Sequence, residues 1–122
     1  MKKEDSTNSI NKEFLHRVCK LNEGLDLISG RWKGIILIYI SENINRFSLL
    51  KLALSDKITD QTLGRQLKEL EKTNLIEKTF IPGFPARVDY NLTAAGAALL
   101  PILVTLDQWA EDHYPEKNDE KS

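Results

Sequence analysis

Apolar residues in the middle of the chain recur every three or four positions, and further along they recur every second position. Leu63, Leu67 and Leu70 form a single stripe at helical spacing. Thr59 is a favourable residue for capping the start of this helix, and Asn74 tolerates the left-handed backbone that often ends one. The opposite side of the predicted helix presents amides and cations, namely Gln61, Arg65, Lys68 and Lys72.

The following stretch has the pattern of a β-hairpin. Val88, Tyr90 and Leu92 alternate with polar residues, which is typical of a half-buried strand. Residues 75–81 predict its partner strand, and the Pro-Gly-Phe-Pro-Ala sequence at 82–86 predicts a long tip between them. A helix with an outward polar face beside a hairpin is the outline of a winged helix-turn-helix.

The flanking patterns predict further helices over 11–19, 23–29, 31–42 and 49–54, and a long helix after Thr93. Ser48 is expected to cap the 49–54 helix, and a short turn then leads into the helix after Thr59, as in helix-turn-helix motifs. The predicted fold is mainly α with a small β-hairpin wing. We expect one domain over 11–113, a disordered tail over 1–10 and an acidic tail over 114–122.

Composition restricts the function more than it reveals it. The 122 residues suffice for one domain, and the net charge of −1 supports nucleic-acid binding only weakly. A single cysteine excludes an internal disulfide and suits a reducing cytoplasm, and neither a secretory signal nor a membrane span is evident. His16 and His113 lie in terminal segments without a nucleophile or metal-type partner nearby. We therefore predict a cytoplasmic protein that is not an enzyme and has no metal site and no cofactor.

Several segments, in this order, resemble the HxlR-type winged helix-turn-helix transcriptional regulators of bacteria. They are Cys19, Gly24-Leu25-Asp26-Leu27-Ile28-Ser29-Gly30-Arg31-Trp32, Arg46-Phe47-Ser48-x-Leu50, Leu63-x-x-Gln66-Leu67-Lys68-Glu69-Leu70-Glu71, Pro85-Ala86-Arg87-Val88-x-Tyr90-x-Leu92-Thr93 and the Leu-Pro-x-Leu around Pro101. The resemblance implies a homodimeric DNA-binding regulator that often responds to electrophiles or oxidants. The chain departs from the family in Lys20, where proline usually follows the cysteine, in Gly64, and in Asn74, where glycine is usual.

A helix in the major groove reads base edges through amide and guanidinium groups. The predicted DNA-binding residues are Arg46, Ser48, Thr59, Gln61, Thr62, Arg65, Gln66, Lys68 and Arg87. Each has a plainer alternative: a solvated helix face, helix caps at Ser48 and Thr59, and a salt bridge from Arg87 across the hairpin to Glu77, with the same ambiguity for Arg46.

Apolar stripes at both ends of the chain predict a homodimer, because one DNA-binding module buries too little surface for useful specificity. The residues are Phe14, Leu15, Val18, Leu99, Leu103, Leu106 and Trp109. The alternative is that these helices pack on each other within one chain. Cys19 is the candidate redox sensor, since His16, Arg17 and Lys20 surround it and a helix is expected to begin near Asn22. Its alternative is a small buried apolar residue.

The sequence thus predicts a regulator that binds double-stranded DNA as a homodimer on two half-sites, with a small-molecule or oxidant effector through Cys19. The competing hypothesis is a winged-helix module that binds another protein. The salt dependence of duplex binding separates the two hypotheses, because only phosphate neutralisation gives a steep negative slope.

Overall fold

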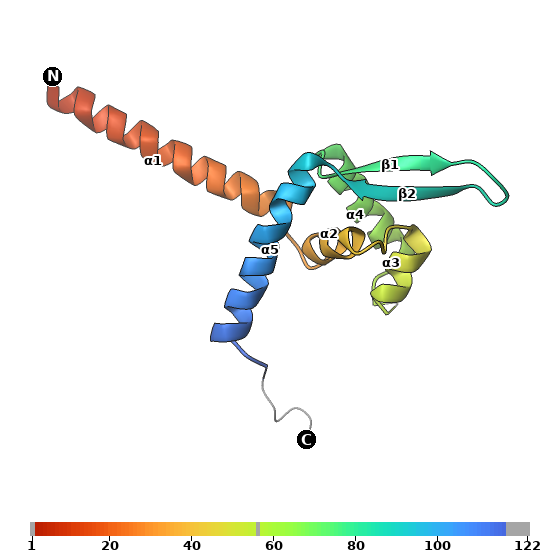
Figure 1. The fold of residues 1–122 in the computed structure, drawn as a ribbon. Coiled ribbons are helices and arrows are strands. Elements are labelled where there is room, and N and C mark those ends of the chain that lie inside the picture. The colour runs from red at the N-terminus through yellow and green to blue at the C-terminus, as the bar shows by residue number, and fades with distance from the viewer. Residues whose placement is uncertain (1, 56, 117–122) are drawn as a thin grey trace. The chain divides into compact units, whose positions relative to one another are not determined.

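The computed structural model describes residues 2–55 and 57–116, and side chains from residue 11 onward. It divides between Arg31 and Trp32 into two compact units, inside the range 11–113 for which the sequence predicted one domain. The first unit contains helix α1 (Lys2–Leu27). The second contains α2 (Lys33–Ser41), α3 (Phe47–Ala53), α4 (Asp60–Lys72), the strands β1 (Ile76–Ile81) and β2 (Arg87–Leu92), and α5 (Ala94–His113) (Figure 1).

Helix α1 is one continuous helix, whereas the sequence analysis predicted a disordered tail over 1–10 and two helices over 11–19 and 23–29. The second helix was expected to begin near Asn22, and Gly24 follows it closely. Both lower helix propensity, by up to about 1 kcal/mol for glycine, but neither removes a backbone donor as proline would. From residue 11 to Asp26 every side chain of α1 is exposed in the single chain.

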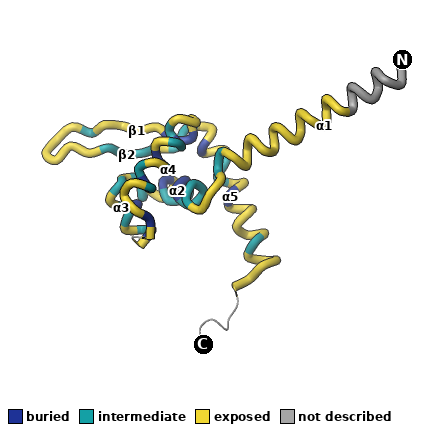
Figure 2. The backbone as a smooth tube through the Cα atoms, turned by 180° about the vertical axis from the view of Figure 1, so that it is seen from behind, coloured by how far each residue is buried: buried dark blue, intermediate teal, exposed yellow. Residues whose placement is uncertain are grey.

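In the second unit, α2, α3 and α4 form a helical cluster from which the hairpin extends (Figure 1). Their core consists of aliphatic side chains that are almost fully buried, chiefly Ile36, Leu37, Leu50, Leu63, Leu67, Leu70 and Ile76. Figure 2 shows this burial concentrated in the helices, while most of the hairpin is exposed. In α2, Ile36, Leu37 and Ile40 are buried, and Ile35, Ile38 and Tyr39 are half-buried.

Helix α3 begins earlier than predicted. Its N-cap is Arg46 and no side chain completes the cap, so the expectation that Ser48 caps this helix is wrong. Phe47 belongs to the first turn of the helix. The loop before it is nevertheless joined to the hairpin, because the Tyr90 amide donates a 2.8 Å hydrogen bond to the Asn45 carbonyl.

The predicted hairpin is confirmed as an antiparallel pair in which Ile76 lies opposite Leu92 and Ile81 opposite Arg87. Thr93 caps α5, as expected: its hydroxyl accepts from the Gly96 amide at 3.1 Å and donates to the Asn74 carbonyl at 2.7 Å. Asn74 has the predicted positive φ, at 65°. In the described residues, none of the helices combines the length and apolar character needed to cross a bilayer.

Candidate nucleic-acid interface

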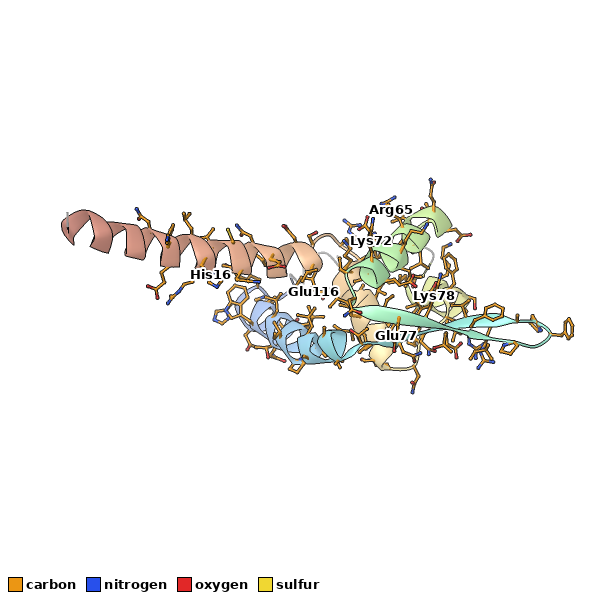
Figure 3. The ribbon with its side chains drawn as sticks, turned by 90° about the horizontal axis from the view of Figure 1, so that it is seen from above. His16, Arg65, Lys72, Glu77, Lys78 and Glu116 are labelled. Carbon is orange, nitrogen blue, oxygen red and sulfur yellow. The ribbon has the colours of Figure 1, made fainter. Side chains whose placement is uncertain are left out.

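Helix α4 has one buried face and one open face. Leu63, Leu67 and Leu70 are buried in the core, and Gln61, Arg65, Lys68 and Lys72 are exposed. Figure 3 shows Arg65 and Lys72 pointing outward along this helix. Thr59 fixes the start of the helix, since its hydroxyl accepts from the Thr62 amide at 3.0 Å and donates to the Thr62 hydroxyl at 2.9 Å. The cap interpretation of Thr59 is therefore confirmed.

The carboxylates of α4 are each paired with a lysine from a neighbouring element. Lys33 of α2 lies 2.7 Å from Glu69, Lys51 of α3 lies 3.1 Å from Asp60, and Lys78 of β1 lies 3.9 Å from Glu71. The acids of the helix thus balance cations from α2, α3 and the hairpin. Arg65, Lys68 and Lys72 have no ion pair of their own within residues 2–55 and 57–116.

The contact between Lys33 and Glu69 also sets the charge of this carboxylate. The hydrogen bond from Lys33 and the attraction of its ammonium group lower the pKa of Glu69, and Arg65 and Lys72 lower this pKa further. Glu69 is consequently ionised at neutral pH and neutralised locally. The exposed face of α4 therefore presents amides and cations together with carboxylates that are already paired with lysines, as expected for a surface that meets polyanionic DNA.

A second group of polar residues lies at the base of the hairpin. Asp89 Oδ1 is 3.0 Å from Arg87 Nε and 3.6 Å from Arg46 Nε, and Asp89 Oδ2 is 3.4 Å from Arg87 Nη2. The sequence suggested Glu77 as an alternative partner for Arg87. This prediction is wrong, because Glu77 lies opposite Asn91 in the hairpin. The spacing of Arg87 and Asp89 puts both on one face of β2, and this signal was available in the sequence.

The two arginines border an open cavity of about 400 Å³ lined by Arg46, Phe47, Ser48, Arg87, Val88 and Tyr90. Ser48 is exposed here, so its hydroxyl is free of the cap role predicted for it. Burial raises the pKa of the Tyr90 phenol, and Glu71 raises it further, so this group is neutral beside the cations. Of the remaining predicted contacts, Gln61 is exposed, whereas Thr62 and Gln66 are half-buried.

The predicted dimerisation residues have different surroundings. Phe14, Leu15 and Val18 are exposed on α1 in the first unit. On α5 in the second unit, Leu106 and Trp109 are each 50% exposed and border an open apolar groove with Pro101, Ile102 and Thr105. Leu99 is half-buried. Leu103 is only 6% exposed and lies near Gly34 of α2, so the prediction that it offers surface to a second copy is corrected.

Cys19 lies within α1, away from both ends of the helix, and its side chain is exposed. The alternative interpretation, in which Cys19 is a small buried apolar residue, therefore does not hold in the single chain. The surroundings of the thiol also differ from those expected, because no helix begins near Asn22 and Lys20 is paired with Glu23 at 3.1 Å.

Two helices joined by a short turn, an outward polar helix and a following hairpin define a winged helix-turn-helix protein. The HxlR-like helix-turn-helix family matches residues 27–118, and the chain belongs to this family. It is 35% identical over 95 residues to the HTH-type transcriptional regulator YdeP of Bacillus subtilis, covering 78% of this chain and 73% of that one. It is 30% identical over 100 residues to the regulator YodB of the same organism, covering 82% and 88%.

Solved structures agree with the fold. The redox regulator HypR in its reduced form superposes with a TM-score of 0.71 at 31% identity, covering 76% of this chain and 91% of that chain. The reduced form of YodB gives a TM-score of 0.71 at 28% identity, covering 80% and 96%. The structural neighbours are thus winged-helix transcriptional regulators.

Proposed function

We propose that this chain is a sequence-specific, DNA-binding transcriptional regulator that acts in the cytoplasm as a homodimer on two half-sites. The observation that carries this proposal is the separation of charge on α4. Glu69, Glu71 and Asp60 are each paired with a lysine from another element, while Gln61, Arg65 and Lys68 are exposed together. Each carboxylate of such a helix already has a cationic partner. The helix can therefore enter the major groove without unpaired negative charges that face the phosphates.

The roles of the individual residues follow from their positions. Gln61, Gln66 and Arg65 are placed to read base edges, the amides suiting adenine and the guanidinium suiting guanine. Thr62 suits a thymine methyl group or a phosphate, and Lys68 a phosphate. Arg46, Ser48 and Arg87 at the hairpin base would contact the DNA backbone or the minor groove, which positions the helix without reading sequence.

Arginine substitutions test these roles directly. We expect Arg65→Ala to weaken binding to the preferred operator by about 1–3 kcal/mol and to relax the preference at one base pair. We expect Arg87→Ala to weaken all duplexes alike and to reduce the salt slope by about 1. Arg17→Ala removes the same group from α1 and serves as the control. The measurement is a mobility-shift series over operator variants and salt concentrations.

An Arg65→Ala protein with unchanged base preference would refute the assignment of this residue. Binding of wild type that does not depend on salt would instead favour the alternative function, a module whose groove and wing bind another protein.

A second candidate function, oxidant sensing, is supported by the exposed thiol of Cys19 and by structural neighbours that are described as redox regulators. The chain has one cysteine, so a disulfide between protein thiols would join two copies. We expect diamide to change the DNA affinity of wild type and to leave Cys19→Ser unchanged. Equal responses of the two proteins would exclude Cys19 as the sensor.

A further inference from the structure

Asp89 occupies an unusual place for a carboxylate in a surface proposed to bind DNA. It lies between two arginines from different elements, Arg46 in the loop before α3 and Arg87 at the start of β2. Its side chain is 20% exposed, whereas those of Arg46 and Arg87 are 44% and 45% exposed. The carboxylate is therefore the inner group of the cluster and the two guanidinium groups are the outer ones.

The geometry leaves much of each guanidinium available. Asp89 engages Arg87 through Nε and Nη2. A guanidinium has five N–H donors, so three of those on Arg87 are not used by Asp89. Arg46 faces the same carboxylate with its Nε at 3.6 Å, an ion-pair distance. The terminal Nη groups of both arginines can thus bind an anion in the neighbouring cavity, which Ser48 also lines.

The backbone holds this arrangement in place. The Tyr90 amide, one residue after Asp89, donates to the carbonyl of Asn45, one residue before Arg46. The distance between the strand and the loop is therefore fixed next to Asp89 and Arg46. Two cations and one carboxylate leave a net charge of +1 in the cluster, which favours an anion such as a phosphodiester.

We propose that Asp89 is a positioning residue that holds Arg46 and Arg87 as one clamp for a DNA backbone phosphate. This inference rests on the proposed function. Without Asp89, two long and flexible side chains would have to be ordered when the phosphate binds, at a cost in rotamer freedom. With Asp89, this ordering is completed before the duplex arrives.

The sign of one substitution decides between positioning and simple charge. Asp89→Asn keeps the size of the side chain and removes a negative charge near the phosphates. If the charge alone mattered, binding would become tighter. If Asp89 positions the clamp, Asp89→Asn weakens binding, by roughly 5- to 30-fold for the loss of ordering in two arginines.

The assay is fluorescence anisotropy with the full chain and a fluorescein-labelled duplex of mixed sequence, long enough for two half-sites, because a phosphate contact does not depend on sequence. Glu77→Gln is the matched control, since Glu77 is an exposed carboxylate of the same hairpin that lies opposite Asn91. It reports the pure charge effect, and we expect unchanged or slightly tighter binding.

The test is completed by measuring the effect of Asp89→Asn on duplex affinity in a variant that lacks both arginines, where we expect the opposite sign. In the Arg46→Ala, Arg87→Ala double variant, Asp89 has no clamp to position, so adding Asp89→Asn should tighten binding. If Asp89→Asn binds the duplex as well as or better than wild type, the inference is overturned. If Arg87→Ala binds the duplex more weakly than wild type in the same assay, the proposed function still stands. Wild type without salt-dependent binding, in contrast, refutes the proposed function itself.

Stability is checked by thermal unfolding of each variant. Should Asp89→Asn unfold at the assay temperature, Asp89→Glu replaces it, because it keeps the charge and moves the carboxylate by one methylene. Positioning predicts weaker binding for Asp89→Glu, and unchanged binding would overturn the inference.

Discussion

Helices α4 and α5 both have apolar residues at spacings of three and four, but their stripes end in different surroundings. Leu63, Leu67 and Leu70 of α4 are at most 2% exposed. Ile102, Leu106 and Trp109 of α5 are between 50% and 60% exposed, although Leu103 on the same helix is buried. The stripe of α4 is therefore covered within the chain, and much of that on α5 is left uncovered.

This difference shows which residues stabilise the single chain and which are available to a partner. Burial of an aliphatic side chain contributes about 1.5–3 kcal/mol, and the leucines of α4 gain this on folding of one copy. The uncovered side chains of α5 gain it only when something else covers them. Contiguous apolar surface of this kind marks protein interaction sites, which is why it forms part of the proposed homodimer interface.

The largest expected effect comes from truncating Leu67 of α4, and Leu106 of α5 provides the comparison. Leu67→Ala should lower the free energy of unfolding by about 2–5 kcal/mol, because it leaves a cavity in the core. Leu106→Ala should have a much smaller effect on unfolding of the monomer. It should instead raise the dimer dissociation constant, measured by analytical ultracentrifugation over a dilution series.

Leu52→Ala is the control for Leu106→Ala, since Leu52 is an exposed leucine on α3 outside the proposed interface. We expect it to alter neither property. A wild-type chain that is monomeric at micromolar concentration would remove the dimer from the proposal and leave the stripe of α5 without an assigned role.

Much of the fold was predictable because its signals are local. The caps at Thr59 and Thr93, the left-handed Asn74 and the strand β2 each depend on a few neighbouring residues, and the structure confirms them. The burial along β2 does not alternate strictly, because Asp89 is half-buried like Val88 and Tyr90. The break expected near Asn22 was wrong for a related reason. Asn22 is a weak helix former, but the apolar stripe of α1 continues past it to Leu25.

The candidate site was less predictable because it depends on tertiary contacts. Periodicity identifies the stripe on α5 but not that Leu103 is the residue covered by α2. Likewise, nothing in the local pattern says that Lys33 of α2 would pair with Glu69 of α4. Asp89 was missed because it was assigned only to the polar side of a strand, where its spacing from Arg87 carried more information.

The two helices also differ in their glycines, and this difference gives a further test. A Cβ at Gly96 of α5 would overlap the carbonyl oxygen of Leu75, a backbone atom that has little freedom to move. Gly96→Ala should therefore lower the free energy of unfolding by about 1–3 kcal/mol, measured by urea denaturation. An unchanged midpoint would mean that the junction between β1 and the start of α5 adjusts more easily than this contact implies.

Gly64 of α4 provides the smallest effect and the opposite sign. A Cβ there meets no atom within 4 Å, so Gly64→Ala should raise the free energy of unfolding by about 0.5–1 kcal/mol through the better helix propensity of alanine. A loss of stability in urea denaturation would contradict this. The same variant also tests whether the missing side chain at Gly64 serves the contact with DNA. If duplex affinity falls while stability rises, the space beside Gly64 is needed by the DNA backbone. If affinity is unchanged, Gly64 only lowers the helix propensity of α4.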